Sequence, residues 1–216
     1  MMTPPVTIAM RVWAGVFVSV VIAVLTVAPA RAEWFADAHI GVGVTQNDDV
    51  KFTTRSFEST ATVNYTSSVS PGLRVGRWFT DFPWFGLAVA ASYFGPQADL
   101  QVIPLSVLMM ARYRVMKNEE FPDGMVHLYA ALGPGLFISH LDGSLGGRTG
   151  SDTSTDIGLD MRLGAMLFVE QNIGLFTEYR FTHVSPAFTL GSGTTATKAE
   201  TTFNTHHIVV GVSFRF

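Results

Sequence analysis

Apolar side chains recur at every second position in eight stretches of this chain. In DIGLDMRLGAMLFVE, for example, apolar residues from Ile157 to Val169 alternate with small, charged or larger side chains that share the opposite face. A period of two residues is typical of β-strands, whose successive side chains point to opposite faces. We therefore predict strands near 34–45, 72–79, 84–94, 102–115, 126–139, 156–170, 174–183 and 204–216.

The segments between these predicted strands alternate in length. The connections at 80–83, 116–124 and 171–172 are short and carry turn-forming Asp, Asn, Pro and Gly. Those at 46–70, 141–154 and 185–202 are longer, and 95–100 is a brief corner on the same side. An even number of strands with this alternation predicts an antiparallel up-and-down sheet with both termini at the short-turn end. These longer segments are expected to be outward-facing loops, and the residues of the glycine-rich GSLGGRTGSD suit a mobile extracellular loop.

The first 32 residues have the three parts of a secretory signal peptide. A start without acidic residues ends at Arg11, an apolar core covers 12–27, and Ala30-Arg31-Ala32 fits the small-x-small cleavage rule. We expect cleavage after Ala32 and a mature domain that covers residues 33–216. The apolar core is short for a membrane-spanning helix, which makes an uncleaved anchor the weaker interpretation.

The two faces of the predicted strands differ sharply in charge. Arg77 is the only charged residue that shares its parity with the apolar positions, and it lies near a strand end. The other face carries charges of both signs, with Asp37 beside the ion-pair candidates Arg74, Arg112, Arg114, Asp156, Asp160, Arg162, Glu170, Glu178, Arg180 and Arg215. An uncharged face suits lipid, and arginines among carboxylates suit a confined interior. The pattern favours an all-β, transmembrane, eight-stranded antiparallel up-and-down β-barrel over a soluble sandwich, because backbone in lipid must be fully paired.

The last strand gives further support. NTHHIVVGVSFRF ends on Phe216, with Phe214 and other apolar residues at alternate positions before it. This ending, GLRVGRWFTDFPWFGLAVAASYF (72–94) and EYRFTHVSP (178–186) resemble the small eight-stranded outer-membrane β-barrel proteins often labelled porin-like. The resemblance covers the whole mature chain. It implies a Gram-negative outer membrane and an assembly machinery that reads Phe214 and Phe216.

Charge and composition narrow the partners. The formal net charge is −3 and there is no cysteine, so neither a nucleic-acid partner nor a disulfide framework is expected. No cofactor or metal is expected either, since the adjacent His206 and His207 point to opposite faces of a strand. We predict a monomer whose partners are outer-membrane lipid and lipopolysaccharide, with interior hydrogen bonding for His207.

Three functions fit such a barrel. The first is a structural or surface-interacting role, with an interior plugged by its own ion pairs because eight strands leave little free bore. The second is a channel for small apolar molecules, for which Pro134, between two glycines in the fifth strand, offers either a lateral gap or, more simply, a bulge. A conducting polar pore needs a continuous water path that this bore hardly permits.

The third function is enzymatic. His183 and Ser185, with Glu200 as the orienting acid, resemble the base and nucleophile of outer-membrane lipid A deacylases, which are also eight-stranded barrels. That family places an asparagine after its serine to stabilise the oxyanion. Pro186 stands here and has no N–H to donate, which favours a non-enzyme.

Overall fold

A computed structural model describes residues 32–46, 48–54, 57–145, 148–190 and 197–216. The predicted signal segment therefore lies outside the described residues, apart from Ala32. No helix in the described part of the chain is long and apolar enough to cross a membrane.

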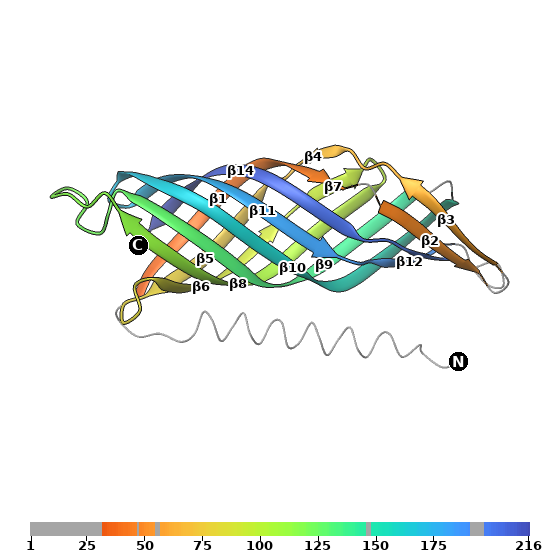
Figure 1. The fold of residues 1–216 in the computed structure, drawn as a ribbon, viewed down its shortest axis with the longest axis horizontal. Coiled ribbons are helices and arrows are strands. Elements are labelled where there is room, and N and C mark those ends of the chain that lie inside the picture. Colours follow the sequence, from red (N-terminus) through yellow and green to blue (C-terminus); the bar gives the residue numbers. More distant parts are fainter. Residues whose placement is uncertain (1–31, 47, 55–56, 146–147, 191–196) are drawn as a thin grey trace.

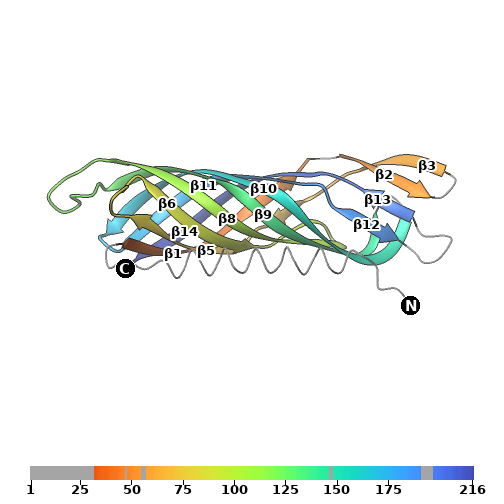
Figure 2. The ribbon, with the colours of Figure 1, turned by 90° about the horizontal axis from the view of Figure 1, so that it is seen from below.

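Eight long antiparallel strands form the barrel (Figures 1 and 2). They are β1 (Ala32–Thr45), β5 (Gly72–Phe79), β6 (Phe85–Ser92), β8 (Leu100–Val115), β9 (Val126–Leu145), β10 (Arg148–Glu170), β11 (Ile173–Val184) and β14 (Phe203–Arg215). Each pairs with the next along the chain, and β1 pairs with β14, so the sheet closes on itself. Both ends of the described chain meet at the short-turn end, where Trp34 and Phe216 exchange two backbone hydrogen bonds of 3.0 and 3.1 Å.

The side chains that alternate in the sequence point alternately to the outside and the inside of the barrel wall. On β14, Ile208 and Val210 are more than half exposed, while their neighbours His207 and Val209 are fully buried. The same holds on β10, where Leu163 is 64 % exposed and Asp160 and Arg162 are buried. Apolar side chains thus cover the outside of the wall, and the charged ones fill the inside.

Beyond the far end of the barrel, the connections form a second sheet where we predicted outward-facing loops. It contains β12 (Ala187–Leu190), β13 (Thr197–Glu200), β2 (Asp48–Thr54) and β3 (Phe57–Val63), in that order. Two short strands, β4 (Ser67–Val69) and β7 (Phe94–Gln97), pair with β1 and β8. The described residues of 141–154 are not a loop but strand, because β9 extends to Leu145 and β10 begins at Arg148 (Figure 1).

Pro134 does not produce a bulge in the wall. Gly133, Pro134 and Gly135 pair with β10 without interruption, and the register with β8 is the same on both sides of the proline. The prediction of a bulge is therefore wrong for this strand. Gly133 lies so close to β8 that a Cβ would stand 1.8 Å from a backbone oxygen, and Leu108 is fully buried behind it. The pairing between β8 and β9 lapses at Gly133 and Pro134, although the two backbones stay close there. A lateral exit at this place therefore stays a prediction.

Candidate functional site

A belt of six charged side chains crosses the middle of the barrel interior. Arg74 of β5 donates to Asp37 of β1 over 2.6 Å and to Glu178 of β11 over 2.7 Å. Tyr129 of β9 also donates to Glu178, over 2.9 Å. Arg162 lies 3.4 Å from the same carboxylate and links this half of the belt to the other.

Asp160 is the centre of the second half. Its carboxylate accepts from the guanidinium groups of Arg162 and Arg180 at 2.8–3.1 Å and from the hydroxyl of Ser106 at 2.7 Å. Arg180 reaches further, to Ser92, over 2.5 Å. The belt therefore holds three arginines and three carboxylates, all buried, and its formal charges cancel. Paired in this way, buried charges avoid the large cost of an isolated ion.

Two clusters of buried apolar side chains lie on either side of this belt. Toward the loop end, a cluster of buried apolar side chains joins the upper interior to the second sheet: Val50, Phe52, Val63, Phe94, Leu100, Val102, Phe137, Leu141, Val184, Phe188, Ala199 and Phe203. Toward the termini lies the other: Phe35, Trp78, Ala88, Ala90, Leu108, Met110, Phe121, Tyr129, Ala131, Met166, Phe168 and Phe176. The cavity beside Arg74 and Trp78 measures about 10 Å³, close to the minimum for one water molecule.

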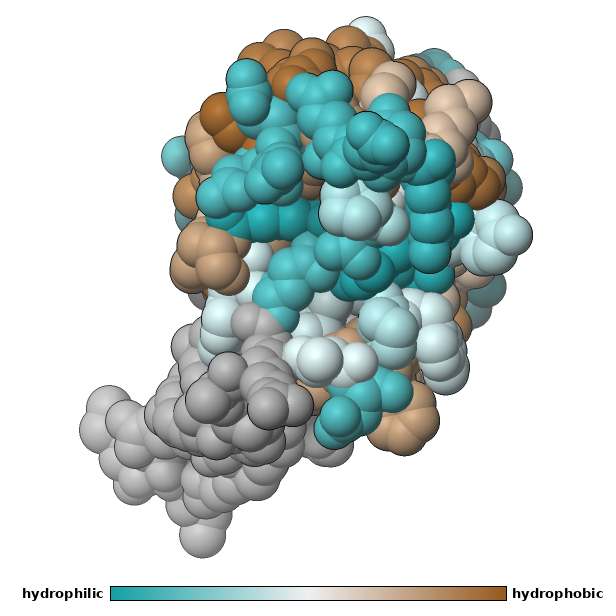
Figure 3. All heavy atoms as spheres, turned by 90° about the vertical axis from the view of Figure 1, so that its left-hand side faces the viewer, coloured by the Kyte–Doolittle hydropathy of each residue, from teal (hydrophilic) through white to brown (hydrophobic). Residues whose placement is uncertain are grey.

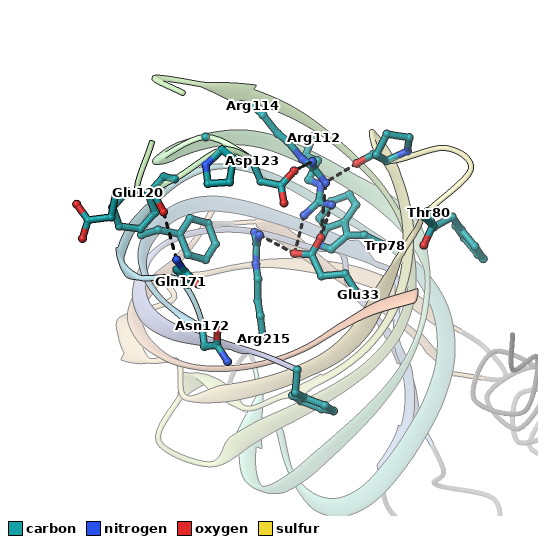
Figure 4. A pocket seen from close by; sticks show the side chains of 17 residues that line it. Glu33, Trp78, Thr80, Arg112, Arg114, Glu120, Asp123, Gln171, Asn172 and Arg215 are labelled. Carbon is teal, nitrogen blue, oxygen red and sulfur yellow. Dashed lines mark hydrogen bonds and ion pairs between the residues drawn. The ribbon is translucent and has the colours of Figure 1, made fainter. Parts of the chain in front are cut away.

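The end of the barrel that carries Glu33 and the C-terminal Phe216 is hollow and polar. Glu33 lies there between Arg112, 2.6 Å away, and Arg215, also 2.6 Å away, with Arg114 at 3.5 Å (Figure 4). The guanidinium groups of Arg112 and Arg215 stack on Trp78 and Phe168, at 4.3 and 3.8 Å from the ring centroids. Together with the 116–125 turn, these residues line a pocket of about 590 Å³. Figure 3 looks onto this end, with hydrophilic atoms in the middle and hydrophobic ones around the rim.

The family model of the outer membrane protein beta-barrel domain matches residues 17–216. The chain belongs to this family. It is accordingly a transmembrane β-barrel protein of the Gram-negative outer membrane. Barrels of this class have short turns on the periplasmic side and longer loops outside the cell, and we name the two ends of this barrel accordingly.

Solved structures of low sequence identity were also found. Neisserial surface protein A shares 18 % identity over 86 % of this chain and 97 % of its own, with a TM-score of 0.49. The attachment invasion locus protein Ail of Yersinia pestis shares 16 % over 84 % and 98 %, with a TM-score of 0.40. The outer membrane protease OmpT of Escherichia coli shares 10 % over 84 % and 97 %, with a TM-score of 0.30. A comparison with curated protein sequences found no match.

Most of the residues predicted for the lumen do lie inside the barrel, where they form two separate groups. Arg74, Asp160, Arg162, Glu178 and Arg180 belong to the central belt with Asp37, whereas Arg112, Arg114 and Arg215 belong to the periplasmic mouth around Glu33.

Two predicted members lie outside both groups. Asp156 is half-buried and accepts a 2.5 Å hydrogen bond from Ser154, and Glu170 is exposed at the end of β10. Glu33, by contrast, was not among the candidates. The sequence could have identified it as an interior residue, because Glu33 lies on the same face of the first strand as Asp37.

The three residues of the deacylase hypothesis each have a different partner. His183 Nδ1 lies 2.7 Å from Asn204 Oδ1, and Ser185 Oγ lies 3.2 Å from Thr202 Oγ1. Glu200 is exposed, and its hydrogen bond from Lys198 lowers the pKa of its carboxyl group. The structure therefore does not bring a base, a nucleophile and an orienting acid together at this place.

The two adjacent histidines are split between the faces of β14, as expected. His207 points inward and is fully buried, with its Nε2 3.4 Å from the hydroxyl of Thr182 and its ring against Phe94. His206 points outward. Among the described residues there is no group of three or more His, Cys, Asp or Glu side chains that could hold a metal ion.

Proposed function

We propose that this protein is a non-conducting, non-enzymatic component of the outer membrane that anchors a small sheet outside the cell. The observation that supports this proposal is the layered interior, in which an ion-paired belt lies between two clusters of buried apolar side chains. Water and ions would have to cross all three layers. An eight-stranded barrel has no spare width for such a path once its own side chains occupy it.

The second sheet supports a surface role. Its inner face is apolar, since Phe52, Phe188 and Ala199 are buried in the upper cluster. Its outer face carries polar and charged side chains, and Lys51 and Lys198 are among the exposed ones. This sheet packs on the barrel through the upper apolar cluster, and its outer face would be available to lipopolysaccharide or to external ligands.

The periplasmic mouth supports the expected processing of the chain. Cleavage after Ala32 would leave Glu33 as the first residue, and three arginines hold its carboxylate at the seam between the first and last strands. Amino-terminal sequencing of the protein purified from outer membranes is expected to begin at Glu33. A sequence that begins upstream of Ala30 would contradict the proposed domain boundary.

Conductance in planar lipid bilayers tests the proposed function. The folded protein is expected to give no ion current above that of protein-free bilayers, while an open porin measured in the same bilayers serves as the positive control. Single-channel steps that scale with the amount of folded protein, and that disappear after heat unfolding, would overturn the proposal. Mass spectrometry of lipid A from expressing cells tests the enzymatic alternative, for which a loss of acyl chains that depends on Ser185 is the required result.

A further inference from the structure

The outer wall carries a cluster of polar side chains on β11 and β14 near the extracellular end, called the polar notch below because it interrupts the apolar rows of the wall. The register places the wall residues in rows, and the row Leu163, Tyr179, Ile208 and Val42 is mostly apolar. The next row outward is Met161, Phe181, His206 and Val44, and the one after it begins with Leu159, His183 and Asn204. Hydrogen-bonding side chains therefore stand between exposed apolar neighbours, since Leu159 on one side is 37 % exposed and Val44 on the other is 53 % exposed.

The polar groups of this notch are held in place by one another. His183 is bonded to Asn204 over 2.7 Å, and Ser185 to Thr202 over 3.2 Å. The imidazole of His206 is bonded on one side to the Tyr179 hydroxyl over 2.6 Å and on the other to the Gln46 side chain over 2.9 Å. The ring of Phe181 lies 5.1 Å from the His206 ring. The notch is thus a preorganised set of imidazole, amide and hydroxyl groups with two aromatic rings beside it.

This notch continues upward into the charged face of the second sheet. The even-numbered residues of the segment that leads into β14 all point away from the interior, from Lys198 and Glu200 through Thr202 to Asn204. Lys51 lies opposite Glu200 in the register. Two lysines and one glutamate therefore lie further along the same face of the chain, and Lys198 is paired with Glu200.

We propose that this notch binds the sugar headgroup of an outer-leaflet glycolipid of the lipopolysaccharide type. The notch is continuous with the lipid-facing wall, so a lipid is the molecule that lies against it in the membrane. Polar groups on the lipid side of a barrel are unfavourable unless they have partners. Amide, imidazole and hydroxyl groups beside aromatic rings match sugar hydroxyls and amides, and the lysines above match the phosphates that such headgroups carry. The inference does not depend on the sealed lumen.

Retention of lipopolysaccharide by the folded protein tests the proposal. The full chain is expressed in cells, extracted in mild detergent and titrated with purified lipopolysaccharide in native mass spectrometry, alongside a phospholipid without sugar. The test variant combines His183→Leu with Asn204→Leu. His140→Leu is the matched control, because His140 is also exposed on the wall and hydrogen bonded to a residue of the neighbouring strand, Thr153.

We expect the double variant to bind lipopolysaccharide about tenfold more weakly, as the loss of two hydrogen bonds predicts, with the control and phospholipid binding unchanged. The heat-dependent mobility of the barrel on gels shows that each variant is folded, and a second variant, His206→Phe, is expected to weaken binding in the same direction. Unchanged lipopolysaccharide binding in both variants would overturn the proposal. So would an equal loss of phospholipid, or a change from dimer to monomer in the double variant, since the notch would then contact a second copy.

Discussion

Replacing Asp160 by alanine is expected to be among the most damaging single changes in the barrel. Its carboxylate is completely buried, accepts from two arginines and a serine, and separates two guanidinium groups of the same sign. Alanine would leave Arg162 and Arg180 with reduced compensation in a dry interior. The remaining carboxylates, Asp37 and Glu178, are engaged mainly by Arg74.

The expected magnitude follows from the burial of the pair. Removing one partner of a buried ion pair costs about 3–5 kcal/mol of folding free energy, because the charge that remains is uncompensated. Asp156 provides a matched control on the same strand. It is half-buried, and its hydrogen bond comes from Ser154, so Asp156→Ala should cost about 1 kcal/mol or less.

The assay is reversible urea unfolding of the purified barrel in lipid vesicles, followed by tryptophan fluorescence. Trp78 reports on the interior and Trp84 on the lipid-facing surface near the periplasmic turns. The free energies of unfolding of the two variants are compared with that of the parent chain. If Asp160→Ala costs no more than Asp156→Ala, the belt is not a sealed network, and water must reach these arginines.

Three further changes test other parts of the wall. Gly133→Val is expected to lower the free energy of unfolding by about 2 kcal/mol or more, since its Cβ would overlap a backbone oxygen of β8, and Gly95→Ala, with 3.3 Å of room, is the milder control. Phe188→Ala should cost about 3–5 kcal/mol and should expose the second sheet to proteinase K on intact cells; unchanged resistance would argue against the upper apolar cluster. Deletion of Phe216 removes both backbone hydrogen bonds to Trp34 and is expected to reduce the folded fraction recovered in outer membranes, and full recovery would show that closure does not need it.

The barrel could be predicted because the same alternation of lipid-facing and interior residues occurs in each of its eight strands. Lipid tolerates few charges, so every second residue in each strand is apolar, and a residue such as Ile208 is identified as lipid-facing by parity alone. Closure by β1 and β14 followed from the even strand number and the apolar ending. The same parity rule separated His207, which is buried, from His206, which is not.

The second sheet was harder to predict because its strands are short and lie outside the membrane. In DVKFTT, Val50 and Phe52 are buried and Lys51 and Thr53 are exposed, so the alternation is present but lasts only a few residues. Such a segment pairs only because distant segments supply partners. Phe188, for example, comes from the other end of the chain, and its contact with Phe52 cannot be read from either stretch.

The separation of the charges into belt and mouth could not be deduced from parity either. Parity gives the face of a side chain, whereas its depth depends on register and on the tilt of the strands. Arg112 and Arg162 look equivalent in sequence, yet one reaches Glu33 at the periplasmic mouth and the other Asp160 in the middle. The pairing of strands several positions apart around the ring decides which charges meet.

Thiol accessibility tests the central claim most directly, because the chain contains no cysteine. Single cysteines replace Ser213 inside the barrel, Val210 on its lipid-facing wall and Thr53 on the outer sheet, and each variant is treated with a water-soluble maleimide in the folded state. A sealed, lipid-embedded barrel predicts rapid labelling of the cysteine at 53 alone, with that at 213 reacting only after unfolding and that at 210 only with a membrane-soluble probe. Labelling at 213 as fast as at 53 in the folded protein would contradict a closed interior.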